Sequence, residues 1–186
     1  MKCTLTGAVA RKVVFVMVLC FLAMSCAYAG KIDIVAQLSP YSHQSVSMTS
    51  GIHHSSYGFN VKGGARYNIW DKLTAGLDVD FDLYRYKELA ESYLVIGFMA
   101  KAGYSFDFTD RIFGEIEIGL GLDLRKVGSR TKASFGTEYC FGGGYRFTEM
   151  ISATAGLDFH WGFQEGGGSS SVDIATRIML GAIISL

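Results

Sequence analysis

The chain has 186 residues, and its 17 basic and 17 acidic side chains give a formal net charge of zero. Apolar residues make up 49% of the chain, which contains a single proline. This balance excludes the strongly basic surface that nucleic-acid-binding proteins carry, and the length fits one domain.

The N-terminal segment has the pattern of a secretory signal peptide. Three basic residues accompany the apolar stretch 13–24, and the small-x-small sequence Ala27–Ala29 follows it. This order is typical of a cleaved signal. We therefore expect residues 1–29 to be removed and residues 30–186 to form the mature, exported domain.

Two alternatives exist for this segment. An uncleaved membrane anchor is disfavoured, because the apolar core is shorter than the ~20 residues that a spanning helix needs. Lipidation of Cys26 is the other alternative, although Leu22 lies one position too far upstream for a lipoprotein signal. Cleavage leaves 14 basic and 17 acidic residues, a net charge of −3, and retains Cys140 of the four cysteines. No intramolecular disulfide can then form.

Apolar and polar residues alternate through the mature chain, and this period of two predicts strands. Between Leu73 and Leu83, for example, six apolar residues alternate with a face that carries three aspartates. Each predicted strand has ten or so residues, near the ~9–11 of a tilted membrane-spanning strand. The eight predicted strands cover residues 31–38, 57–67, 72–83, 93–106, 112–124, 134–147, 151–163 and 172–186.

Glycines indicate which face points inward. A water-soluble barrel would bury the apolar face and favour Thr, Lys or Glu on the wet one, since glycine weakens an exposed strand. A crowded eight-stranded lumen instead gives glycine a role, because it leaves room for charged neighbours. The polar-face glycines are Gly64, Gly76, Gly97, Gly103, Gly119, Gly121, Gly136, Gly142, Gly156 and Gly181.

Aromatic residues flank the aliphatic part of the apolar face, as they do at membrane interfaces. One group lies near one set of turns and the second near the other. We therefore expect the apolar face to contact lipid, where closure of the sheet satisfies every backbone group. The two groups are Tyr67, Trp70, Tyr104, Phe106, Tyr145 and Phe147, and Tyr57, Phe59, Phe81, Trp161 and Phe163.

The inward charges then have to satisfy one another, because an unpaired buried charge is costly. Treating residues 68–72 as a hairpin loop places Lys62 opposite Asp78, and a similar count places Lys101 near Glu115 or Glu117. The remaining arginines are expected to pair with the remaining aspartates. The predicted lumen network comprises Lys62, Arg66, Asp78, Asp80, Asp82, Lys101, Glu115, Glu117, Asp123, Arg125, Arg146, Asp158 and Arg177.

Three turns repeat an aromatic residue followed by a polar segment that contains an acid. The acids Asp71, Asp110 and Glu149 are spaced 39 residues apart, which is one pair of strands with its turns. We expect these short connections on the periplasmic side, where barrels of this class have them.

The alternating strands, residues 64–81 and residues 142–159 resemble the small eight-stranded outer-membrane barrels. This group includes the transmembrane domain of outer membrane protein A, the opacity-type adhesins, and outer membrane proteins of the W and X types. The resemblance covers the mature chain and implies an all-β, antiparallel up-and-down transmembrane barrel, embedded in outer-membrane lipid.

The resemblance also implies insertion by the barrel assembly machinery. Gly181, Ile184 and Leu186 occupy positions where such barrels carry a glycine and two aromatic residues as the insertion signal. Leu186 departs from the usual terminal phenylalanine. No binding site is shared across this group, so none is transferred to this chain.

Function is expected to depend on the surface rather than on a pore. An eight-stranded barrel has room only for side chains, which disfavours a wide pore and leaves a narrow channel for small or apolar solutes as the alternative. The expected loops, of which residues 39–57 form the longest, allow an adhesin-like role with a host or surface ligand, although the resemblance implies longer loops in adhesive relatives.

Metal binding and catalysis are less favoured by the residues. His43, His53 and His54 of the first loop are more typical of a polar loop than of a metal site. His160 lies beside Asp158 on the polar face without a serine near the rim. We expect no metal, no cofactor and no enzymatic activity.

Overall fold

The computed structural model describes residues 32–48, 53–70, 72–86, 92–127, 130–166 and 169–186. The signal peptide predicted for residues 1–29 lies outside the described residues and stays a prediction. No helix in the described ranges is long and apolar enough to cross a membrane.

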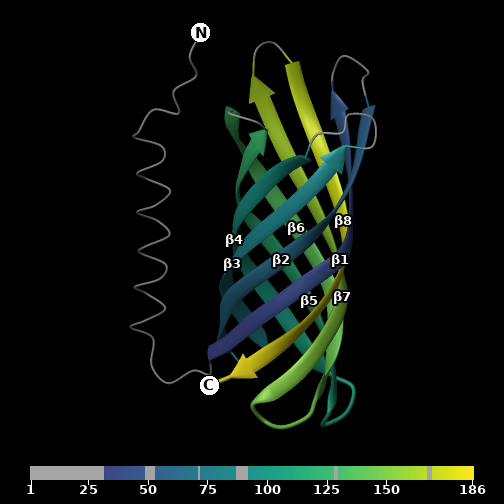
Figure 1. The fold of residues 1–186 in the computed structure, drawn as a ribbon. Coiled ribbons are helices and arrows are strands. Elements are labelled where there is room, and N and C mark those ends of the chain that lie inside the picture. The colour runs from purple at the N-terminus through teal and green to yellow at the C-terminus, as the bar shows by residue number, and fades with distance from the viewer. Residues whose placement is uncertain (1–31, 49–52, 71, 87–91, 128–129, 167–168) are drawn as a thin grey trace. The chain divides into compact units, whose positions relative to one another are not determined.

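Eight antiparallel strands close into a barrel in which each strand pairs with its neighbours in sequence and β8 pairs with β1 (Figure 1). The predicted fold class, an all-β up-and-down barrel of eight strands, is confirmed. The strands are β1 (Ile32–Met48), β2 (His53–Trp70), β3 (Leu73–Tyr86), β4 (Ser92–Asp107), β5 (Ile112–Val127), β6 (Arg130–Arg146), β7 (Ile151–Gly166) and β8 (Ser169–Ser185).

The strands are longer than predicted. They run for 14 to 18 residues instead of ten or so, and the segment 39–57, predicted as the longest loop, is mostly strand. Its residues looked like a loop because β1 and β2 carry polar side chains on both faces there. The outward apolar band covers only part of each strand, as on β3, where it ends at Leu83 before Arg85.

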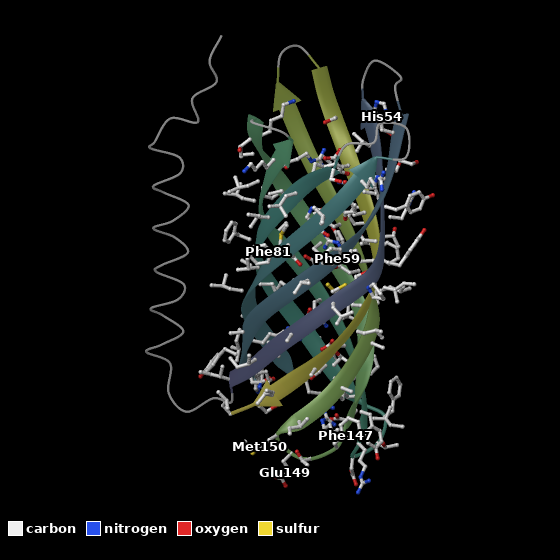
Figure 2. The ribbon with its side chains drawn as sticks, in the orientation of Figure 1. His54, Phe59, Phe81, Phe147, Glu149 and Met150 are labelled. Atoms are coloured by element: carbon white, nitrogen blue, oxygen red, sulfur yellow. The ribbon has the colours of Figure 1, made fainter. Side chains whose placement is uncertain are left out.

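The two ends of the barrel differ. The lower end in Figure 1 carries the β4–β5 and β6–β7 turns and the end of β8, and the upper end carries the C-terminal ends of β1, β3, β5 and β7. Figure 2 shows Phe147 and Met150 at the lower end, with Phe59 and Phe81 near mid-height. The second aromatic group therefore lies well below the upper ends of the strands.

The lower turns follow one local design. In both, a threonine Oγ1 accepts hydrogen bonds from the backbone N–H groups two and three residues later. Thr109 accepts from Arg111 at 3.3 Å and Ile112 at 2.9 Å, and Thr148 accepts from Met150 at 3.2 Å and Ile151 at 3.0 Å. The third predicted turn acid, Asp71, lies outside the described residues.

The apolar face points outward and the polar face inward. Along β3, Phe81 and Leu83 are 48% and 43% exposed, while Asp78, Asp80 and Asp82 are almost completely buried. Large apolar residues are exposed all around the barrel, an area far beyond the patches that soluble monomers show. A surface of this kind is stable against lipid and not against water.

Candidate functional site: the lumen and its charge network

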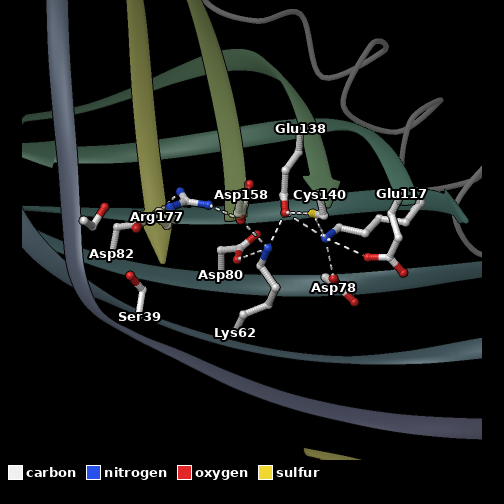
Figure 3. A network of polar contacts seen from close by, with 12 residues as sticks. Ser39, Lys62, Asp78, Asp80, Asp82, Glu117, Glu138, Cys140, Asp158 and Arg177 are labelled. Carbon is white, nitrogen blue, oxygen red and sulfur yellow. Dashed lines mark hydrogen bonds and ion pairs between the residues drawn. The ribbon is translucent and has the colours of Figure 1, made fainter. Parts of the chain in front are cut away.

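Ion pairs form one continuous chain through the lumen, in which carboxylates and cations alternate (Figure 3). We call it the ion-pair chain. It joins side chains from seven strands, β2 to β8, from Asp82 toward the upper end to Glu115 near the lower end. In order, its members are Asp82, Arg177, Asp158, Lys62, Glu138, Lys101, Glu117, Arg66 and Glu115.

Lys62 lies at the centre of this chain. Its Nζ is 2.6 Å from Asp158 Oδ2 and 3.6 Å from Asp80 Oδ1, and it also donates to Glu138. The side chains of Lys62, Asp158 and Glu138 have no exposed surface. Charges removed from water in this way are stabilised only by such close partners.

The predicted pairing of Lys62 with Asp78 is wrong. The register places Lys62 opposite Asp80 and Gly64 opposite Asp78. Strand β2 continues to Trp70, so the turn to β3 is tighter than the five-residue loop assumed, and the register moves by two residues. A shift of two keeps every side chain on its face.

Lys101, and not Lys62, forms the ion pair with Asp78. Its Nζ is 2.8 Å from Asp78 Oδ2, 2.7 Å from Glu138 Oε1 and 3.7 Å from Glu117 Oε2. The expected proximity of Lys101 to Glu115 or Glu117 is therefore met by Glu117. Glu138 links the two lysines from β6.

Three arginines occupy buried positions in the lumen. Arg177 is 2.6 Å from Asp82 and 3.1 Å from Asp158. Arg66 pairs with Glu117, with its Nη2 donating to Oε2 at 2.7 Å and its Nε 2.5 Å from Oε1. Arg125 pairs with Asp173.

Arg146 lies apart from this network. It is about one-third exposed, is 2.7 Å from Asp107 at the lower rim, and its guanidinium lies 4.6 Å from the centre of the Phe113 ring. The prediction that Arg146 belongs to the lumen network is therefore wrong, because this residue lies at the lower rim. Asp123 instead accepts a hydrogen bond from His160 Nε2 across 2.8 Å.

Sequence reasoning left Glu138 and Asp173 out of the network. Both could have been found from strand parity, because Glu138 is two residues from the inward Cys140 and Asp173 is four residues from Arg177. The predicted network has seven acids and six bases, and this excess of one acid becomes four when Glu138 and Asp173 are added and Arg146 is removed. Nine carboxylates face five lysines and arginines plus His160, the carboxylates being Asp78, Asp80, Asp82, Glu115, Glu117, Asp123, Glu138, Asp158 and Asp173.

Glycines make room for these side chains, as predicted. A Cβ on Gly136 would lie 2.8 Å from Asp123 Oδ2 and 3.0 Å from His160 Cε1. A Cβ on Gly97 would lie 3.1 Å from Asp123 Oδ1. Both distances are shorter than normal contacts, so the glycines allow the charged layer to form.

Apolar and aromatic side chains close the lumen at both ends. Toward the upper end, the rings of Tyr84 and Tyr93 stack at 5.3 Å, and their hydroxyls bond to Ser42 at 2.8 Å and Ser56 at 2.6 Å. Toward the lower end, a buried cluster joins Phe113 to two aliphatic residues of β1 and β8. The charged layer is thus covered on both sides.

The described part of the lumen contains a small cavity. A cavity of about 10 Å³ lies below the tyrosines, which is room for about one water molecule. Its lining residues are Gln44, Asp82, Tyr84, Val95, Asp123, Arg125, His160, Gly162, Asp173, Ala175 and Arg177.

Metal-ligating groups gather at one point of the described chain. Glu138, Cys140 and Asp158 offer ligand atoms within 4.8 Å of one another. The ammonium groups of Lys62 and Lys101 already form ion pairs with these carboxylates. The positive charge that a metal would supply at this point is therefore supplied by the two lysines. The histidines expected in a loop lie on strands instead, with His43 opposite Tyr57 and His54 opposite Val46; the side chain of His53 is outside the described part.

The three residues predicted as an insertion signal lie near the lower end of β8. Gly181 faces Gln37 across the β1–β8 pairing, and Ile184 is 47% exposed on the outer face. The N–H of Leu186 donates to Ile32 O at 2.8 Å, which completes the closure of the barrel. Recognition of these residues by the assembly machinery stays a prediction.

Comparison with solved structures finds the same architecture. Neisserial surface protein A has a TM-score of 0.64 and 20% identity, over 84% of this chain and 99% of that one. Ail of Yersinia pestis gives 0.46 and 14%, over 85% and 100%. The N-terminal barrel of Pseudomonas aeruginosa OprF gives 0.43 and 16%, over 81% and 99%. No protein-family model and no curated protein sequence matches the chain.

The expectation that the chain has no enzymatic activity is corrected by the same comparison. The outer membrane enzyme PagL matches with a TM-score of 0.40 and 17% identity, over 74% of this chain and 97% of that one. The Escherichia coli outer membrane protease OmpT gives 0.41 and 9%, over 87% and 100%. The fold by itself neither excludes nor assigns an enzymatic activity.

The closed ring of eight strands, the outward apolar face and the likeness to Neisserial surface protein A lead to one conclusion. The chain has the fold of the small eight-stranded outer-membrane β-barrels.

Proposed function

We propose that the protein is an integral outer-membrane barrel with a closed lumen, which acts through the surface that it displays outside the cell. The observation that carries this proposal is the filled interior. The ion-pair chain crosses the lumen, Tyr84 and Tyr93 cover it above, and Phe113 covers it below. A pore would need a continuous water-filled path, whereas the cavity in the lumen holds about one water molecule.

Adhesive binding through long loops is less well supported than binding through the strands. The connections at the upper end fall between strands that reach Met48, Tyr86, Val127 and Gly166 and resume within a few residues. The surface available to a host or surface ligand is therefore largely the upper part of the barrel wall.

Conductance separates this proposal from a narrow channel for small or apolar solutes. The purified, refolded protein in a planar bilayer is expected to give no steady ohmic current. Replacing Lys62 and Arg177 with alanine should open small, fluctuating currents, because it removes the two cations that hold Asp158. A steady current from the unmodified protein would make the channel the better account.

Orientation is tested by labelling cysteines in cells, with the native Cys140 replaced by alanine. A cysteine at Ser55, near the upper end of β2, should react with a membrane-impermeant maleimide on intact cells. A cysteine at Asp110, in a lower turn, should react only after permeabilisation. Equal labelling of both on intact cells would overturn the assignment of the lower turns to the periplasm.

A further inference from the structure

The small cavity in the lumen is lined by three carboxylates and two guanidinium groups. Two of the carboxylates have a guanidinium partner. Asp82 Oδ2 lies 2.6 Å from Arg177 Nη2, and Asp173 pairs with Arg125. Each of these pairs is neutral as a unit, so the net charge around the cavity depends on the third carboxylate and its partner.

Asp123 is the third carboxylate, and its partner is a histidine. Its Oδ2 accepts a hydrogen bond from His160 Nε2 at 2.8 Å. A neutral imidazole donates such a bond without contributing a charge, so at alkaline pH the lining carries one uncompensated negative charge. The rest of the lumen cannot compensate it, because carboxylates outnumber cations there as well. A buried charge of this kind is costly unless a counter-charge lies beside it.

Each of the three carboxylates also has an oxygen that can bind a further ligand. Oδ1 of Asp82, Asp123 and Asp173 is buried and accepts no hydrogen bond from the described residues. The carboxylates of Asp123 and Asp173 approach the same point of the lining. A Cβ on Gly162 would lie 3.4 Å from Asp123 Oδ2 and 3.7 Å from Asp173 Oδ2. The cavity therefore offers buried carboxylate oxygens around a space of about 10 Å³.

We propose that this cavity binds one small monovalent cation, with carboxylate oxygens of Asp82, Asp123 and Asp173 as its ligands. The cavity has room for about one water molecule, and Na⁺, which is smaller than water, is a hard cation that takes oxygen ligands. A divalent ion would exceed the missing charge, and Mg²⁺ keeps several waters for which this cavity has no room. The site lies inside the barrel, so it does not depend on what the outer surface binds.

Na⁺ is the probe, and the measurement is urea unfolding of the full chain in phosphatidylcholine vesicles at about pH 9, where histidine is uncharged. Tetramethylammonium chloride, whose cation is too large for the cavity, keeps the ionic strength constant. The folded fraction on an unheated gel gives the ratio of folded to unfolded protein. Each tenfold rise in Na⁺ above the dissociation constant should raise this ratio about tenfold, as for one ion that binds only the folded chain.

Two variants should lose this response for different reasons. Gly162→Ala adds a methyl group to the cavity lining without changing the charge, and its Cβ would meet neighbours only at ordinary contact distances. Asp173→Asn makes the lining neutral and needs no cation. Both should give a ratio that changes less than about twofold over the same range of Na⁺.

Three matched variants should keep the response. Gly63→Ala adds the same methyl group on the outer face, where it meets no atom within 4 Å. Glu149→Gln removes a negative charge from an exposed turn residue. His160→Gln keeps an N–H donor for Asp123 and is neutral at every pH.

Three results would overturn the site. A wild-type ratio that does not change with Na⁺ would mean that no cation is bound, and a response of His160→Gln alone would show that a proton on the histidine supplies the charge. An undiminished response of Gly162→Ala would place the ion outside this cavity. An equal loss of response in Gly63→Ala would show that the added methyl group acts on unfolding in general.

Discussion

Individual charges in the lumen differ in how many partners they hold. Lys62 contacts three carboxylates and Lys101 contacts three, while Asp78 and Asp80 each contact one cation. With more buried carboxylates than cations, each lysine stabilises several negative charges. Loss of a lysine should therefore cost more than loss of an aspartate.

We test this asymmetry with Lys62→Met and Asp80→Asn. The methionine fills a similar volume but leaves Asp158, Glu138 and Asp80 without their shared cation, so it should lower the free energy of unfolding by about 3–5 kcal/mol. The asparagine removes one excess negative charge and should cost about 1 kcal/mol. Urea unfolding from lipid vesicles measures both, with the exposed Glu149→Gln as the control. A larger loss for Asp80→Asn would show that the lumen does not carry excess negative charge.

For individual residues, the sequence predicted which side chains point into the lumen but not which of them form ion pairs with one another. Alternation placed Lys62, Asp78, Asp80 and Lys101 inward, because the period of a strand is two and does not depend on its neighbours. Which inward charges meet depends on the register, and the register depends on a turn whose length the alternation leaves open. The bridges through Glu138 also cross the lumen between strands far apart in sequence, so pair counting along one hairpin could not find them.

Turns and strands form the next scale. The lower turns at Thr109 and Thr148 have the same hydrogen bonds although they lie 39 residues apart in sequence. Both also direct two successive backbone N–H groups to one carbonyl, that of Ile112 or Ile151. A short turn that satisfies its own backbone groups does not depend on other segments to pair them.

Removing either threonine hydroxyl should weaken its turn. Thr109→Val and Thr148→Val keep the side-chain shape but lose the acceptor for two N–H groups, at a cost of about 0.5–1.5 kcal/mol each. Thr109→Ser and Thr148→Ser keep the oxygen and should retain most of the stability. The free energy of unfolding in vesicles measures each variant, and identical values for valine and serine would show that the hydroxyl bonds contribute nothing.

Neighbouring glycines of β2 provide a test of the two strand faces. A Cβ on Gly63 would meet no atom within 4 Å, whereas a Cβ on Gly64 would lie 2.7 Å from Leu77 O and 2.8 Å from Asp78 Cγ. Gly63→Ala should be neutral or stabilise the strand by up to about 1 kcal/mol. Gly64→Ala should cost about 1–3 kcal/mol, since it displaces Asp78 from Lys101. Equal effects in vesicle unfolding would contradict the inward position of Gly64.

Strand existence was predictable from alternation, while strand ends were not. The upper parts of β1 and β2 carry His43 and several serines on the outer face, because these positions lie above the apolar band. Alternation fades there, so Ser39–Tyr57 resembled a loop. The backbone of β1 continues to pair with β2 from Ser42 to Ser47. This pairing cannot be predicted from the side chains, because they do not alternate between apolar and polar there.

The whole molecule has an inverted arrangement, with charges inside and apolar side chains outside. Its interior is a charged layer between an aromatic cover above and an apolar cluster below. This arrangement is stable only when lipid surrounds the barrel, because in water the outward apolar side chains would remain exposed to solvent. The account therefore depends most on which face of the strands meets lipid.

Two adjacent residues at the middle of β3 test that claim directly, Leu77 on the outer face and the buried Asp78. Leu77→Arg places a charge near mid-membrane and should cost about 2–4 kcal/mol. Asp78→Asn should cost about 1 kcal/mol or less, because Lys101 keeps Glu138 at 2.7 Å. The measurement is the free energy of unfolding from lipid vesicles, followed by tryptophan fluorescence. The account predicts the larger loss for Leu77→Arg; an arginine tolerated better than the asparagine would mean that the charged face points outward and that the barrel is not a membrane protein.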